Sequence, residues 1–301
     1  VKPKIGIVTG VNEQHLATFG SMKNLLSAEG GRELLERLPK KGLLVVNGDN
    51  KYCLDLYKKS LRQGKLKTKI YTLKKDKVDS DIWTEDMAVE KDFVSFIVIV
   101  KEKSRSQSDR GSSMFTTSGE MMHLEVSVAG KQNIQNLLAA ILVAKELGMN
   151  IQEISKACRN IKKEQSGMML RNGVKGINII DSSYSSNPDG VIADLDYLSV
   201  FTAQKVIVMP CLIELGKKSS EIHEQIGKKI AEACDMAIIT TKDKFEEIKV
   251  GAMGNGMSSG MIVFCDNPQK ITSMILSFCK AEDTVLLEGR VPKELVNLLI
   301  K

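Results

Sequence analysis

The sequence predicts an α/β protein of two domains, in which the second domain is Rossmann-like. Along residues 176–289, short apolar runs that end in polar turns alternate with segments of helical spacing, as in βαβ units. Along residues 68–130, strand-like runs follow one another without helices between them, which predicts a small antiparallel sheet in the first domain. A chain of 301 residues can bury two hydrophobic cores of ordinary size.

The first domain is expected to cover residues 1–165. Its predicted strands are short apolar runs closed by polar residues, at 4–10, 42–50, 68–73, 92–100 and 121–130. Helical spacing recurs at 21–38, 133–149 and 151–163, and the polar, serine-rich stretch 101–120 is predicted to be a mobile hairpin tip.

The second domain is expected to cover residues 166–301, because the pattern breaks between 164 and 173. Its predicted strands are at 176–183, 205–210, 236–241, 260–266 and 284–289, with helices between them. Parallel sheets of this kind bind ligands at the carboxyl ends of their strands. The polar stretches 181–189 and 210–216 fall at such ends, so they are candidate ligand-binding loops.

Composition excludes several classes of function. The net charge is only +6, and lysines are interleaved with acids, so we expect no nucleic-acid partner, although anionic small molecules are compatible with it. No apolar run reaches about 18 residues, so we expect neither a membrane helix nor a membrane partner. Six cysteines without a CxxC pair predict buried thiols in a reducing cytoplasm.

One stretch at a strand end, VTGVNEQHLATFGS (Val8 to Ser21), contains one of the three histidines of the chain. An imidazole held there is a rigid metal ligand or, alternatively, a cap of the turn or of the next helix. Four further motifs follow in order: NGDN, GKQNIQNLLAA, IIDSSYSSNPDGV and LIELGKKSSEIHEQIG. Together, in this order, the five motifs resemble the Mur ligase family.

The resemblance implies part of an ATP-dependent amide ligase of peptidoglycan precursor synthesis. Such an enzyme would act on a UDP-N-acetylmuramoyl peptide through an acyl phosphate, with ATP and Mg²⁺ as cofactors. An amino acid or dipeptide would supply the amine, and the motifs lean towards the dipeptide-adding branch. Two alternatives stay open: a non-catalytic nucleotide-binding or partner-binding module derived from the family, and a relative that extends folate or a poly-amino acid.

The resemblance also assigns residues of the first domain. His15 matches a magnesium ligand, and Glu29 stands where the family has a carbamylated lysine, so its carboxylate is expected to replace the carbamate. Asn136 matches an asparagine that contacts adenine, and Asn47 and Asp49 fall in a turn that shapes the site. The plain alternatives are an exposed helix position for Glu29 and an N-terminal cap for Asn136.

In the second domain, Asp181, Tyr184 and Asn187 match positions that contact the nucleotide, and Arg290 remains from a late basic motif. Glu214 and His223 match a pattern that is expected to face the incoming amine substrate. For His223, the alternative is a histidine on a helix surface.

Several positions depart from the family pattern. Ser182 and Ser185 replace an aspartate and an asparagine, while Met168 and Glu288 replace an arginine and a lysine. The chain contains no G-x-x-G-K-[ST] loop. In this fold, such a loop binds the phosphates of ATP through its backbone amides and its lysine. We therefore expect an N-terminal region that carries the loop, in the same polypeptide or on another chain, and no turnover by this chain alone.

Overall fold

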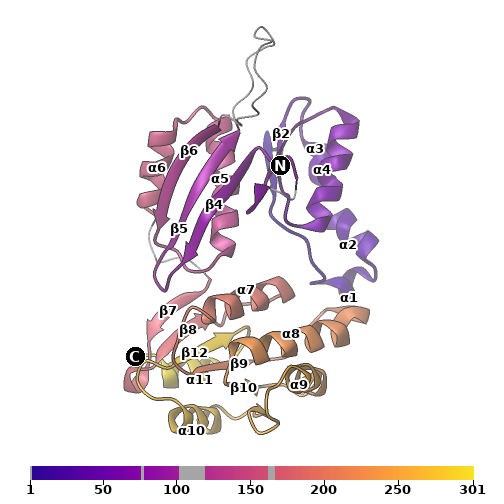
Figure 1. The fold of residues 1–301 in the computed structure, drawn as a ribbon. Coiled ribbons are helices and arrows are strands. Elements are labelled where there is room, and N and C mark those ends of the chain that lie inside the picture. Colours follow the sequence, from indigo (N-terminus) through magenta and orange to yellow (C-terminus); the bar gives the residue numbers. More distant parts are fainter. Residues whose placement is uncertain (1, 76–77, 102–118, 162–166) are drawn as a thin grey trace.

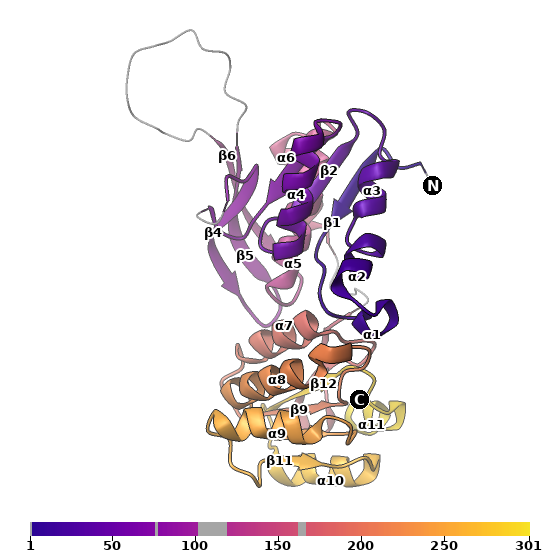
Figure 2. The ribbon, with the colours of Figure 1, turned by 90° about the vertical axis from the view of Figure 1, so that its right-hand side faces the viewer.

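The structure is a computed structural model that describes residues 2–75, 78–101, 119–161 and 167–301. We call residues 2–161 the N-terminal half and residues 167–301 the C-terminal half. Each half contains a six-stranded sheet with helices packed on it. The two halves stack end to end, and helix α7 (Pro188–Leu198) lies where they meet (Figures 1 and 2).

The sheet of the N-terminal half joins the predicted antiparallel strands to the parallel ones. Its order is β1 (Ile5–Val8), β2 (Leu43–Asn47), β3 (Lys67–Tyr71), β4 (Ile82–Val89), β5 (Val94–Lys101) and β6 (Gly119–Val126). Strands β1 to β4 pair in parallel, and β4, β5 and β6 pair antiparallel. Most of the predicted hairpin tip, residues 102–118, lies outside the described residues.

Strand β4 was missed by the sequence prediction. The register of its pairing with β5 shifts between Glu85 and Ala88, and Asp86 lies there with a φ of 48°. The bulge interrupts the alternation of apolar and polar residues by which a strand is recognised.

The helices of the N-terminal half are α1 (Leu16–Phe19), α2 (Met22–Ala28), α3 (Arg32–Arg37), α4 (Lys51–Gln63), α5 (Gln132–Glu146) and α6 (Ile151–Arg159). A continuous helix over 21–38 is wrong, because the chain turns between α2 and α3. Gly31 has a φ of 79°, and a Cβ there would stand 2.8 Å from side-chain atoms of both Leu56 and Val8. The turn therefore requires glycine.

The sheet of the C-terminal half confirms the Rossmann-like prediction. Its order is β11 (Ile262–Phe264), β10 (Met236–Ile239), β9 (Lys205–Met209), β12 (Thr284–Glu288), β8 (Asn178–Ser182) and β7 (Met169–Asn172). All neighbours are parallel except β7, a short edge strand that the sequence did not predict.

Both faces of this second sheet are covered by helices. One core contains residues of α7, α8 (Ser219–Ala233) and α9 (Phe245–Gly254), including Leu195, Ile226 and Ile248. The opposite core contains residues of α10 (Pro268–Phe278) and α11 (Lys293–Leu299). This double covering explains why the strands read as continuous apolar runs rather than as alternating ones.

Two further expectations concern cysteines and membranes. All six cysteines are buried free thiols, as their spacing and apolar surroundings predicted. Within the described ranges, no helix has the length and apolar character that a membrane crossing requires.

We predict that the crossing of α8 and α9 depends on two glycines. A Cβ on Gly227 would stand 2.0 Å from the carbonyl oxygen of Ile248, and one on Gly251 would stand 2.0 Å from that of Glu224. Gly227→Ala should therefore lower the free energy of unfolding by about 3 kcal/mol, measured by urea denaturation. The matched control is Gly254→Ala, which has open space and should leave stability unchanged or raise it by up to about 1 kcal/mol. Equal stability of both variants would contradict the close crossing.

Candidate functional site

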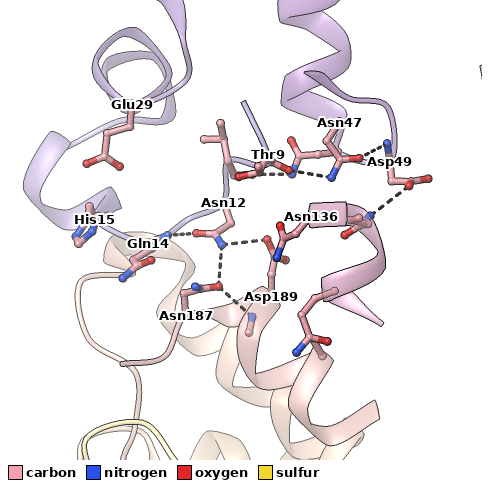
Figure 3. Close-up of a pocket in the computed structure, with 17 residues that line it drawn as sticks. Thr9, Asn12, Gln14, His15, Glu29, Asn47, Asp49, Asn136, Asn187 and Asp189 are labelled. Atoms are coloured by element: carbon pink, nitrogen blue, oxygen red, sulfur yellow. Dashed lines mark hydrogen bonds between the residues drawn. The ribbon is translucent and has the colours of Figure 1, made fainter. Parts of the chain in front are cut away.

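A cavity of about 600 Å³ lies between the two halves (Figure 3). It opens at the carboxyl ends of β1 and β2, beside the first turns of α5 and the N-terminus of α7. Its polar lining includes Thr9, Asn12, Gln14, His15, Glu29, Asn47, Asp49, Asn50, Gln132, Gln135, Asn136, Asn187 and Asp189. Polar groups that converge from several strand and helix ends are typical of a binding site in α/β proteins.

Two asparagine side chains fix the loop that follows β1. Asn47 is 5% exposed, and its Nδ2 donates to the carbonyl of Thr9 at 2.8 Å while its Oδ1 accepts from the amide of Asp49 at 2.9 Å. Asn50 donates to the carbonyl of Val11 at 3.0 Å and caps α4. These bonds agree with the expectation that Asn47 and Asp49 shape the site.

Hydrogen bonds cross from one half to the other along one wall of the cavity. The Nδ2 of Asn12 donates to Oδ1 of Asn187 and to Oδ2 of Asp189, both at 3.0 Å (Figure 3). Nearby, the amide of Ala17 donates to the carbonyl of Glu214 at 2.9 Å. Asn12 and Asp189 were not among the predicted site residues, although both lie in the quoted polar stretches at strand ends.

His15 and Glu214 contact each other across the same seam. His15 Nδ1 lies within hydrogen-bond distance of Glu214 Oε2, and the two side chains are 40% and 41% exposed. Both residues have left-handed backbone, with φ of 66° and 64°. The sequence assigned them separately, His15 to a metal and Glu214 to the amine substrate. The structure brings the two side chains together.

Glu29 and Asn136 line the cavity from different elements. Glu29 is the C-terminal cap of α2 and lies on the same side of the cavity as His15, away from Asn136 (Figure 3). Asn136 follows the first turn of α5 and donates to Oδ1 of Asn133 at 3.3 Å. Asn187 accepts from the amide of Gly190 at 3.0 Å, so it caps α7 while it faces the cavity.

The side chains that line the cavity could supply only some of the ligands of a metal ion. Among the described residues, no three Asp, Glu, His or Cys side chains gather closely enough to hold a metal ion. Magnesium is commonly held by one or two carboxylates together with water and substrate phosphates, so Glu29 suits it without a full protein cage. Because Glu214 takes Nδ1 of His15, a role as metal ligand falls to Nε2.

Besides Glu214 and His223, the cavity lining lacks three residues that the resemblance assigned to the nucleotide. Asp181 accepts from Nε of Arg171 at 3.0 Å and from the hydroxyl of Ser183 at 2.6 Å. Tyr184 is 88% exposed, and Arg290 is also exposed. In this arrangement of the two halves, the structure does not bring these side chains to His15, Glu29 and Asn136.

His223 departs from the expected contact with substrate and is not on a helix surface either. It is fully buried, and its Nε2 accepts from the amide of Leu212 at 2.9 Å while Nδ1 donates to the carbonyl of Ser219 at 2.6 Å. Both ring nitrogens are thus used by backbone. His223 holds the loop after β9, which carries Glu214, and this supporting role replaces the predicted one.

The position where the resemblance expects a lysine holds a buried acid. Glu288 ends β12 and is 1% exposed, and burial together with the neighbouring Asp194 raises its pKa well above the ordinary value. Met168, where an arginine is expected, packs partly buried against the core under α7.

The structure is that of a two-part α/β protein with a polar cavity between its parts. Residues 1–144 match the model of the Mur ligase middle domain, and residues 168–291 match that of the Mur ligase glutamate ligase domain. The chain belongs to the Mur ligase family.

Similarity to individual members is low but extends over most of the chain. UDP-N-acetylmuramoyl-tripeptide–D-alanyl-D-alanine ligase of Escherichia coli is 23% identical over 96% of this chain and 57% of its own length. UDP-N-acetylmuramate–L-alanine ligase of Syntrophomonas wolfei is 25% identical over 96% of this chain and 58% of its own. The chain thus spans little more than half of each relative.

The solved structures include MurF ligase of Thermotoga maritima in complex with ADP. Its TM-score is 0.75 at 20% identity, and the match covers 99% of this chain and 62% of that one. At this identity the likeness establishes the fold.

We predict that His223 contributes to stability in a pH-dependent way. Burial lowers its pKa below 6.5, so the unfolded chain takes up a proton before the folded one does, and stability falls as the pH drops below 6.5. His223→Phe should lose about 2–4 kcal/mol, since it leaves a buried amide and a buried carbonyl without partners, and should flatten this pH dependence.

Thermal melts from about pH 8 to about pH 5 test this prediction. The matched control is His123→Gln on the exposed face of β6, which should keep the wild-type slope. An unchanged slope in His223→Phe would contradict the assignment.

Proposed function

We propose that this chain is the nucleotide-handling part of an ATP-dependent amide ligase that acts on a UDP-N-acetylmuramoyl peptide. In the proposed reaction, ATP phosphorylates the terminal carboxylate of the peptide. The amine of a dipeptide then attacks the acyl phosphate, the amide bond forms and inorganic phosphate leaves. The names of the two curated relatives, both ligases of UDP-N-acetylmuramoyl compounds, support the substrate class.

The observation that supports this proposal most strongly is the composition of the cavity. Four residues assigned by resemblance, His15, Glu29, Asn136 and Asn187, come from different elements of both halves and line one space. A polar space of about 600 Å³ at strand ends and a helix N-terminus suits a phosphate-bearing ligand.

The roles that we propose follow from the chemistry of each side chain. The amide of Asn136 can both donate to and accept from the adenine edge, and Asn187 holds the N-terminus of α7 towards the phosphates. Glu29 and Nε2 of His15 would hold Mg²⁺, which supplies positive charge beside the transferred phosphoryl oxygens. The contact between His15 and Glu214 keeps the two halves in register while substrates bind.

We further propose that the boundary between the two domains lies at residues 165 and 166. The matches to the two family domains end at 144 and begin at 168, and each half has its own cores. The buried free thiols suit a cytoplasmic protein, where these nucleotide-linked substrates would be met.

A non-catalytic binding module is the second candidate. The buried acid Glu288 at the position of an expected lysine, and Met168 at the position of an expected arginine, favour it. Such a module would bind the nucleotide without needing a metal.

We predict that Mg²⁺ tightens the binding of ADP to this chain about tenfold, measured by isothermal titration calorimetry. Glu29→Gln and His15→Ala should each remove most of this gain, because they take away the groups that face the metal. The matched control is Glu36→Gln on the exposed side of α3, which should behave as the wild type. Binding that does not depend on Mg²⁺ would favour the binding module.

A further inference from the structure

Two carboxyl groups lie buried beside the cavity. Asp194 on α7 is 6% exposed, and Glu288 at the end of β12 is 1% exposed. They are neighbours, because Glu288 stands opposite Ser182 in the pairing of β12 with β8, and the hydroxyl of Ser182 donates to Asp194. Two ionised carboxylates have only acceptor oxygens, so a hydrogen bond between them requires a proton on one of the two.

The surroundings of this pair contain hydroxyls and amides rather than cations. The Ser182 hydroxyl at the end of β8 donates to Oδ2 of Asp194. From α5, in the other half of the molecule, Nε2 of Gln132 donates to Oδ1 of Asp194 at 3.4 Å.

Among the residues that the structure describes, no lysine, arginine or histidine contributes to the pKa of either acid. Burial raises the pKa of both carboxyls. Each pKa is also affected by the other carboxyl and by nearby serine hydroxyls. The neighbouring acid on β8, Asp181, is paired with Arg171. Within the described part of the chain, Oε2 of Glu288 is buried without a hydrogen-bond partner, so an ionised Glu288 would carry an unsatisfied charge.

We propose that Asp194 and Glu288 share one proton, and that this carboxyl pair is a pH-sensitive bond that holds α7 against β12 beneath the cavity. Through Ser182 the pair also fixes the end of β8, where the loop to α7 begins. Through Gln132 it reaches the N-terminal half. When the shared proton is lost, two buried anions repel each other, and the wall of the cavity formed by α7 loosens.

The direction of the pH dependence follows from the geometry. Burial and mutual repulsion raise the pKa of both groups above their ordinary values of 3.8 and 4.5. The folded chain therefore holds more protons than the unfolded chain as the pH rises above those values. Stability consequently falls with rising pH until the shared proton is lost in the folded state as well.

Thermal melts of the complete chain as a function of pH test the proposal. Relative to Glu288→Gln, in which the opposite contribution of His223 is unchanged, the wild-type midpoint should fall by about 3 °C per pH unit through this window for one proton. Glu288→Gln and Asp194→Asn keep a hydrogen-bonding amide but cannot titrate, so each should remove this slope. The matched control is Asp196→Asn, which lies on α7 and pairs with Lys229 at the surface, and it should keep the slope. A wild-type slope equal to that of Glu288→Gln would overturn the proposal.

An infrared spectrum of the wild-type protein does not depend on variants that fold. At neutral pH, it should show the carbonyl band of a protonated carboxylic acid, and the band should remain in Asp196→Asn. Absence of the band would overturn proton sharing. So would a rise in the wild-type midpoint on addition of K⁺, Na⁺ or Mg²⁺ at constant ionic strength that Glu288→Gln lacks, because a cation would then neutralise the pair.

Discussion

Hydrogen bonds between side chains at the ends of strands and helices join the two halves around the cavity. Asn12 donates to Asn187 and Asp189, His15 meets Glu214, and Gln132 reaches Asp194. Such contacts exchange readily with water, so they contribute little net free energy individually. Apolar contacts cross between the halves as well, because Val89 and Ala129 of the N-terminal half pack against the core of the C-terminal half.

Much of the fold could be predicted because its core strands are buried on both faces. The runs at β2, β9 and β12 are almost entirely apolar. A strand that is buried on both faces has apolar residues at consecutive positions, which makes it easy to recognise in a sequence. The elements that were missed are those whose sequence is shaped by local irregularity. Strand β4 contains a bulge, β7 is a four-residue edge strand, and the break between α2 and α3 depends on a close approach at Gly31.

The site was predicted only in part, for a related reason. The family resemblance pointed to His15, Glu29, Asn136 and Asn187, and these four residues line one cavity. The side chains that join the halves include the amides of Asn12 and Gln132. Their hydrogen-bond partners are far away in the sequence, so the contacts can be recognised only in the folded molecule. A sequence does not show which histidine is buried against backbone, as His223 is, and which faces a cavity. In the same way, the sequence around Glu288 at the end of β12 does not show that its carboxyl is buried beside Asp194, about ninety residues earlier in the chain.

The central claim is that the cavity between the halves binds a nucleotide with a divalent metal. A crystal structure of this chain grown with ADP and Mn²⁺ tests it directly, since manganese can be located by anomalous scattering. We expect the base to lie beside Asn136, the phosphates to point towards the N-terminus of α7, and manganese to bind beside Glu29 and His15. Nucleotide bound elsewhere, or bound in the cavity with no metal beside Glu29, would contradict it.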